Sequence, residues 1–154
     1  MKKGALAIFL LLFMYSGCSY ERKMPSVGMV KGKDIVVILF KKSQFKEAVL
    51  EKVEISLKEK NIKFVTDNVD NSKKYKASDY RAVVYMAEFW AWHTPYHTKR
   101  YFSRNDNVSN IIFFITSGDP DVKIKKPFDA VTSPSRQSEV ERVSSEIVKR
   151  IETF

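Results

Sequence analysis

The sequence contains a single cysteine, Cys18, among its 154 residues. No internal disulfide can form, therefore, and a structural zinc site built from several thiolates is excluded. An exported domain larger than about 80 residues does not need a disulfide, because its hydrophobic core is large enough to keep it folded. The lack of disulfides is thus compatible with export.

The chain also lacks the common catalytic motifs. No serine lies in a Gly-x-Ser-x-Gly elbow, so acyl transfer has no support. The acidic residues in the segment 119–129 alternate with lysines, which is typical of a mixed charged loop rather than of an acid–base pair. We therefore expect a binding protein and not an enzyme.

Acidic residues are fewer than basic ones, with 18 Asp and Glu against 27 Lys and Arg and a net charge of +9. The lysines are scattered along the chain, as on a solvated surface, and they favour contact with an anionic membrane face. Nucleic-acid binding is another use of a basic surface, but no motif of basic and aromatic residues is present. We expect no nucleic-acid partner.

No apolar run is long enough to cross a membrane. The longest, residues 5–15, has about eleven residues, whereas a spanning helix needs roughly twenty. It follows Lys2-Lys3 and precedes Ser16-Gly17-Cys18, which is the order found in a secretory signal. These small residues and the cysteine resemble the lipobox of bacterial lipoproteins, except that Tyr15 stands where that family usually has an aliphatic residue.

The resemblance implies that residues 1–17 are a signal peptide and that an acylated Cys18 anchors the mature protein in the membrane of the cell envelope. Ser19 follows, and not the Asp that retains such lipoproteins at the inner membrane, so we expect the outer membrane if the cell has one. Residues 18–33 contain proline and glycine without periodicity and are expected to form a tether. An uncleaved membrane anchor and ordinary secretion are the alternatives.

The remaining residues, 34–154, are expected to form one α/β domain. Apolar runs rich in β-branched residues predict strands, and apolar stripes at helical spacing predict helices. The expected strands are residues 35–40, 62–65, 80–86, 111–115 and 130–132. One helix is expected after Ser43 as its N-cap, and a second after a capping box of Ser138 and Glu141. Residues 67–78 are expected to form a loop or a frayed helix.

This order of elements predicts a doubly wound parallel sheet with helices on both faces. Together with an aromatic loop after the third strand and the turn Thr116-Ser117-Gly118, it resembles the flavodoxin-like fold, which implies three layers and the strand order 2-1-3-4-5. In the members that bind FMN, a loop rich in glycine and hydroxyls cradles the phosphate. The corresponding residues 40–45 contain no glycine and one hydroxyl. A redox protein that binds FMN or a related flavin weakly is therefore the alternative function, and no other cofactor is expected.

The segment 89–97 contains both tryptophans and both histidines of the chain. The resemblance implies that a planar ligand stacks here, while the rings are equally suited to docking an envelope protein or to packing as core. His93 and His97 have the spacing of two metal ligands on a helix, but Pro95 lies between them and we expect no metal. Hydroxyls and a carboxylate follow neighbouring strands, at the sheet edge where such folds bind ligands. The candidate ligand- or partner-binding residues are Trp90, Trp92, His93, Tyr96, Thr116, Ser117, Asp119 and Ser133.

These observations predict a lipid-anchored envelope lipoprotein that acts as a binding or assembly module through its aromatic loop.

Overall fold

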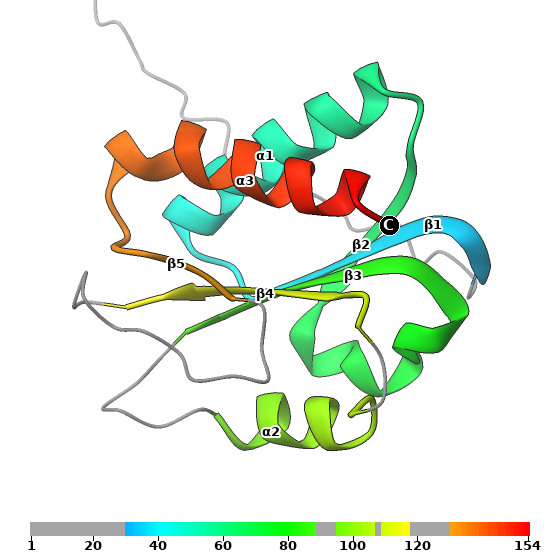
Figure 1. The fold of residues 1–154 in the computed structure, drawn as a ribbon. Coiled ribbons are helices and arrows are strands. Elements are labelled where there is room, and N and C mark those ends of the chain that lie inside the picture. Colours follow the sequence, from blue (N-terminus) through cyan, green and yellow to red (C-terminus); the bar gives the residue numbers. More distant parts are fainter. Residues whose placement is uncertain (1–29, 89–94, 107–108, 118–129) are drawn as a thin grey trace, which may run out of the picture.

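The computed structural model describes residues 30–88, 95–106, 109–117 and 130–154, which form a five-stranded sheet with helical layers on both faces (Figure 1). The strands are β1 (Gly32–Phe40), β2 (Lys63–Asn68), β3 (Tyr80–Glu88), β4 (Ile111–Thr116) and β5 (Ala130–Ser133). All four pairings are parallel, and the strand order is β2-β1-β3-β4-β5. The predicted class, the parallel sheet and the order of its strands are confirmed.

The strand β1 lies inside the sheet, between β2 and β3, and its position explains why its sequence is a continuous apolar run. Its last six residues, Ile35 to Phe40, are all buried, because helices and turns cover both faces of the sheet. Alternate side chains of β1 therefore enter two different cores.

The helix α1 (Gln44–Glu59) begins directly after its predicted N-cap, Ser43. The Oγ of Ser43 accepts a hydrogen bond from the backbone N–H of Lys46 at 3.3 Å, as an N-cap does. At the other end Asn61 has φ = 54°, a left-handed conformation that asparagine tolerates well. The N–H of Ile62 then donates to the Leu57 carbonyl at 2.8 Å, which closes the helix with a Schellman motif.

The helix α3 (Val140–Glu152) confirms its predicted apolar stripe but not its predicted cap. Its buried residues include Val140, Val143, Ile147, Val148 and Ile151. The capping box of Ser138 and Glu141 is wrong. Ser138 lies inside a short 3-10 turn, η3 (Gln137–Glu139), so the N-cap is Glu139, whose side chain makes no capping hydrogen bond.

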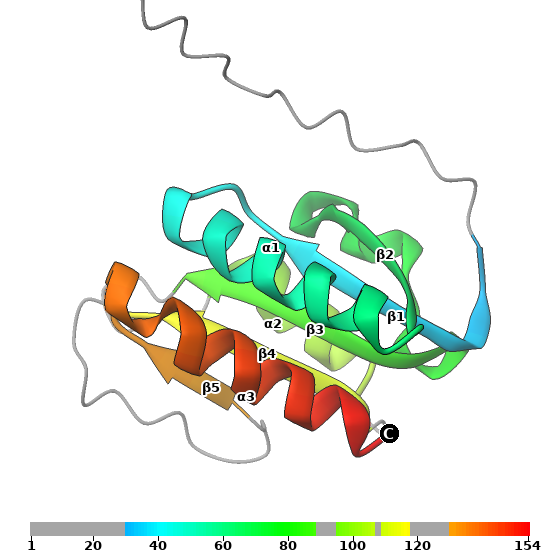
Figure 2. The ribbon, with the colours of Figure 1, turned by 90° about the horizontal axis from the view of Figure 1, so that it is seen from above.

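The helices α1 and α3 lie side by side over one face of the sheet, as the view from above shows (Figure 2). The opposite face is covered by two 3-10 helices, η1 (Val69–Lys74) and η2 (Ala77–Asp79), and by α2 (Tyr96–Ser103) (Figure 1). The segment predicted as a loop or frayed helix thus forms 3-10 turns. The helix α2 was not predicted, because aromatic residues and Pro95 obscured it; Pro95 is its N-cap residue, where a missing N–H does no harm.

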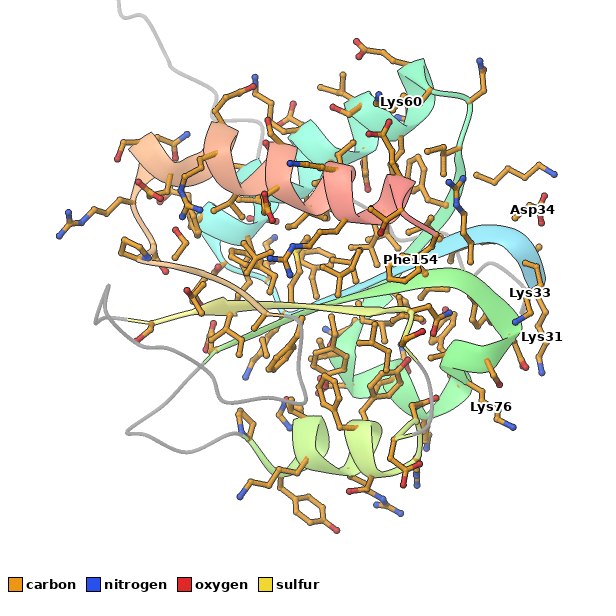
Figure 3. All side chains as sticks on the ribbon, in the orientation of Figure 1. Lys31, Lys33, Asp34, Lys60, Lys76 and Phe154 are labelled. Atoms are coloured by element: carbon orange, nitrogen blue, oxygen red, sulfur yellow. The ribbon has the colours of Figure 1, made fainter. Side chains whose placement is uncertain are left out.

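The amino-terminal edge of the sheet is rich in charge. Lys31 and Asp79 form an ion pair at 2.7 Å, as do Lys63 and Asp34, and the ammonium of Lys33 donates to the backbone carbonyl of Ser78. Figure 3 shows Lys31, Lys33 and Asp34 together at this edge. Across the described ranges, no helix is both long enough and apolar enough to cross a membrane.

Candidate functional site

The carboxyl-terminal edge of the sheet is where polar side chains of several strands meet. Glu88 at the end of β3 is in register with Thr116 at the end of β4, which is in turn in register with Ser133 of β5. The strand order reverses between β1 and β3, and such a switch point is where open α/β sheets bind ligands. The candidate site is therefore this edge, which we call the carboxyl edge.

The turn from β1 into α1 is short and cationic. Only Lys41, Lys42 and Ser43 separate Phe40, the last residue of β1, from the first residue of α1. The two lysines are exposed, while the Ser43 hydroxyl accepts the capping hydrogen bond. The turn contains no glycine, the residue that lets a backbone approach a phosphate most closely.

A buried ion pair lies beside this turn. Lys46, in the first turn of α1, is fully buried, and its Nζ lies 2.9 Å from the Oε1 of Glu88, a side chain that is 31% exposed. Burial lowers the pKa of the Lys46 ammonium, the carboxylate of Glu88 partly restores it, and the positive charge of Lys41 lowers it further. The pair connects α1 to the end of β3.

The Lys46–Glu88 pair was not predicted from the sequence, although the sequence contains a signal for it. Lys46 lies at the spacing of the buried residues Leu50, Val53 and Leu57, so it occupies the apolar stripe of α1 and not its solvent face. A charged residue on such a stripe must find a partner or remain unionised. Glu88, on the neighbouring strand, is that partner.

The predicted hydroxyl residues are brought together at the carboxyl edge, but they are buried. Thr116, Ser117 and Ser133 are 6%, 8% and 3% exposed. The backbone N–H of Ser117 donates to the Ser133 carbonyl at 3.2 Å, and the Ser133 hydroxyl donates to the Pro134 carbonyl at 2.9 Å. These contacts hold the ends of β4 and β5 together. A ligand-binding role for the three residues stays a prediction.

The predicted aromatic residues divide between described and undescribed parts of the chain. Tyr96 opens α2 and is 76% exposed, the most exposed large hydrophobic side chain among the described residues. His97 follows it and is also exposed. The described ranges contain no group of three or more metal-ligating side chains. Cys18, Trp90, Trp92, His93 and Asp119 lie outside the described residues.

Solved structures share this fold at very low sequence identity. Oxidised flavodoxin 2 from Bacillus cereus is similar with a TM-score of 0.55 and 11% identity, over 79% of this chain and 99% of that protein. A flavodoxin from the domain Archaea is similar with a TM-score of 0.51 and 10% identity, over 77% of this chain and 96% of that protein. With the strand order, these likenesses define the chain as a flavodoxin-like α/β protein in fold. No family model matches the sequence, and no curated protein is recognisably similar to it.

The residues of the carboxyl edge do not fit the phosphate of FMN. A phosphate-binding turn offers unobstructed backbone N–H groups at a helix N-terminus. Here each of the three turn residues carries a side chain, and the hydroxyl of Ser43 accepts the N–H of Lys46 at 3.3 Å. Lys46, the one cation buried among the described residues, is already bound to Glu88. The turn after β1 is therefore built to close the sheet edge rather than to hold an anion.

Proposed function

We propose that this protein is a lipid-anchored lipoprotein of the cell envelope whose flavodoxin-like domain acts as a binding or assembly module. The lipobox-like residues 16–18 support the anchor, and the tether over residues 18–33 gives the domain reach away from the bilayer. The carboxyl edge supports the binding role that we propose for the domain. Because the Lys46–Glu88 pair and the turn without glycine stand where a phosphate would bind, binding of a protein partner is favoured over flavin chemistry.

The contact surface of this proposal is the aromatic segment that ends in α2. Tyr96 presents an aromatic ring to solvent at 76% exposure, and tyrosine and tryptophan rings dominate the energetics of protein interfaces. Trp90 and Trp92 precede it by only a few residues in the sequence. The partner expected for such a surface is another protein of the envelope.

The anchor is tested by replacing the acylated residue. We expect the Cys18→Ser protein to appear in the soluble envelope fraction or as an unprocessed precursor, because it has no thiol to acylate. Mass spectrometry of the wild-type protein is expected to find a lipid-modified Cys18 at the N-terminus. An intact initiator methionine with an unmodified sulfur would contradict the anchor.

The contact surface is tested by a photo-cross-linking amino acid at position 96, introduced in living cells. Position 55 is the matched control, because Ile55 is also exposed, at 46%, but lies on α1 over the other face of the sheet. We expect a discrete cross-linked product from position 96 and none from position 55. Equal products from both positions, or none from either, would contradict a contact surface at α2.

The alternative function is a redox protein that binds FMN or a related flavin weakly, and the flavodoxin-like fold is the observation that favours it. Titration of FMN with the purified protein separates the two, because flavin fluorescence is quenched when a protein ring stacks on it. We expect no quenching at micromolar protein. Quenching that the Trp90→Ala variant abolishes would replace the binding module with the redox protein.

A further inference from the structure

The layer opposite α1 and α3 is less complete than the layer they form. The crossover from β1 to β2 contains the sixteen-residue helix α1. The crossover from β2 to β3, in contrast, contains only the short 3-10 helices η1 and η2. Between η1 and α2 an open hollow of about 410 Å³ remains, and a second of about 260 Å³ adjoins it. Both are lined by Ser72, Lys73, Tyr101 and Arg104. The larger has the size of a small-molecule site.

The rim of this hollow is cationic. Lys73 belongs to η1 and Lys76 directly precedes η2, while Arg100 belongs to α2 and Arg104 directly follows it. All four line the hollows and are exposed. Lys76 points out beneath the amino-terminal edge of the sheet (Figure 3). Asp70 is the one carboxylate among the lining residues. Within the described ranges, no ion pair involves Lys73, Arg100 or Arg104, whereas most lysines of the amino-terminal edge are paired.

The spacing of the basic residues on α2 is regular. His97, Arg100 and Arg104 follow one another at intervals of three and four residues, which places them on one side of a helix. That side faces η1, because His97 and Arg100 line the smaller hollow together with Asp70 and Lys73 of η1. An amphipathic helix normally turns apolar residues towards its neighbour. In α2, part of the side that faces η1 is basic, so positive charge is concentrated between α2 and η1.

A buried residue that carries a hydrogen-bond donor lines the hollow. Tyr101 is 2% exposed and lines both cavities, and its hydroxyl has no hydrogen-bond partner within the described part of the chain. Burial raises the pKa of this hydroxyl, and the neighbouring Tyr85 and Tyr80 raise it further, so it remains a protonated donor. A buried hydroxyl without a partner is destabilising by about 1–3 kcal/mol, and such a group calls for an explanation.

The walls of the hollow are held in place by hydrogen bonds. Asn105 donates from Nδ2 to the Tyr101 carbonyl at 2.8 Å and accepts at Oδ1 from the N–H of Ala77 at 2.8 Å, which joins the end of α2 to η2. On the other wall the Tyr75 hydroxyl donates to Asp67 at 2.7 Å, and Asn71 donates to the same carboxylate at 2.8 Å. The cations therefore project from fixed elements, which reduces the entropy lost when a ligand binds.

We propose that the hollow between η1 and α2 binds a phosphate-bearing anion. Arginine forks and a lysine ammonium match the oxygens of a phosphate, and a neutral tyrosine hydroxyl donates to one of them. The site lies on the face of the sheet opposite α1 and α3, and it does not depend on the lipid anchor. Two sources supply this chemistry: a free phosphate compound, or the headgroup of an anionic phospholipid beside which the anchor would hold the domain.

The test titrates the full-length protein, purified in detergent, with inorganic phosphate and with pyrophosphate in a calorimeter, at constant ionic strength set with chloride. The variant is Arg100→Gln with Arg104→Gln, and the control is Lys52→Gln with Lys149→Gln, which removes the same charge from exposed positions on α1 and α3. We expect the arginine variant to bind at least about tenfold more weakly and the control to bind as the wild type does.

The Tyr101→Phe protein separates ligand binding from the general attraction of anions to a basic surface. It keeps every charge and the ring, and loses only the hydroxyl. We expect about a fivefold loss of phosphate affinity, and a melting temperature in the absence of phosphate that is not lowered, because the removed hydroxyl is a buried group without a partner among the described residues. Unaltered affinity in both Tyr101→Phe and the arginine variant would overturn the proposal.

Binding to lipid vesicles distinguishes a free phosphate compound from a phospholipid headgroup as the ligand. Binding to phosphatidylglycerol vesicles, with phosphatidylcholine vesicles as the neutral comparison, is measured by sedimentation for the same proteins. If free phosphate does not bind, but the arginine variant binds phosphatidylglycerol less than the control does, the ligand is a lipid headgroup. If neither probe binds, or if the arginine and lysine variants are weakened equally, no phosphate site exists at this position.

Discussion

The face of the sheet under α1 and α3 is packed with apolar side chains and, among the described residues, no tyrosine, whereas the core on the opposite face combines aliphatic side chains with rings that carry hydroxyls. The first core includes Val36, Ile38, Leu50 and Ile147, all 0% exposed. The second core contains four tyrosines, at positions 75, 80, 85 and 101. In that core the rings of Tyr85 and Tyr101 stack at 5.0 Å between centroids.

The difference between the two cores suits the two faces of the sheet to different roles, one to stability and the other to binding. Aliphatic side chains have no polar atoms to satisfy, so the first core stabilises the fold simply by removing apolar surface from water. Each buried tyrosine brings a hydroxyl that needs a partner. The hydroxyls of Tyr80 and Tyr101 find none within the described residues, so the second core retains polar groups at an energetic cost. We infer that this second face, with its hollow and its exposed Tyr96, is the face that binds.

The largest expected effect is a cavity in the first core. Leu50 is 0% exposed on α1, and its replacement by alanine is expected to lower the free energy of unfolding by about 3 kcal/mol. Urea denaturation measures this value. Tyr101→Phe on the opposite face is the comparison, and it is expected not to lower the free energy of unfolding, because the lost hydroxyl is buried and has no partner within the described residues. Equal losses in the two variants would remove the distinction between the cores.

The next effect concerns the buried ion pair at the carboxyl edge. Lys46→Ala takes the ammonium from Glu88 and leaves a cavity in α1's packing, so we expect a loss of about 2 kcal/mol, less than for a fully buried pair because Glu88 is partly exposed. Lys46→Met keeps most of the side-chain volume and is expected to cost less than about 1 kcal/mol. Both are measured by urea denaturation at pH 7. A Lys46→Met protein as unstable as Lys46→Ala would show that charge, and not packing, dominates.

The regular parts of this fold were predictable from sequence because each is governed by local periodicity and capping. The strands, α1 with its Ser43 cap, and the stripe of α3 all follow from such patterns. The Lys46–Glu88 pair was not predicted, since it joins residues 42 positions apart and depends on the register between α1 and β3. A lysine on an apolar stripe indicates that a buried acidic or polar partner exists, but it does not indicate which residue that is.

The basic hollow was beyond sequence reasoning for a similar reason. Lys73 and Arg104 are separated by a strand and a helix, and only the replacement of a crossover helix by 3-10 turns leaves space between them. The helix α2 was missed because its apolar residues are aromatic and Pro95 suggested an interruption, although proline is well tolerated at a helix start. The aromatic residues that were singled out remain a prediction, apart from the observed exposure of Tyr96.

A smaller effect appears at alkaline pH and again separates the two faces. Burial raises the pKa of Tyr101 and of Tyr75, and in Tyr75 the hydrogen bond to Asp67 adds to it. A tyrosine whose folded pKa lies above its unfolded value of about 10 stabilises the fold below pH 10, and that stability is lost as the pH rises through the folded pKa. Stability should therefore fall above pH 10, by up to about 1.4 kcal/mol at pH 11 for each such tyrosine.

The Tyr101→Phe variant isolates this effect. It is expected to recover about 1 kcal/mol of the loss between pH 9 and pH 11, seen by urea denaturation at each pH. The lowered pKa of Lys46 has the opposite effect on stability, because the cost of burying its ammonium disappears as the pH rises towards about 10.5. This contribution is the same in the wild type and in the variant, so it cancels from their difference. Identical pH profiles for the wild type and the variant would mean that Tyr101 ionises as freely in the folded protein as in the unfolded one.

The smallest effect on stability is expected at the exposed ring of the binding face. Tyr96 buries little surface, and alanine has a higher helix propensity than tyrosine, so Tyr96→Ala should alter the free energy of unfolding by less than about 0.5 kcal/mol. Ile55→Ala, at an exposed position on α1, should be equally neutral. The two variants differ in what they do to a partner: only Tyr96→Ala should lower the yield of a cross-link formed from neighbouring positions on α2, such as Lys99. If Tyr96→Ala instead destabilises the fold by more than about 1 kcal/mol, its ring packs against the protein as part of the core, and the face that we assign to binding would lose its most exposed aromatic contact.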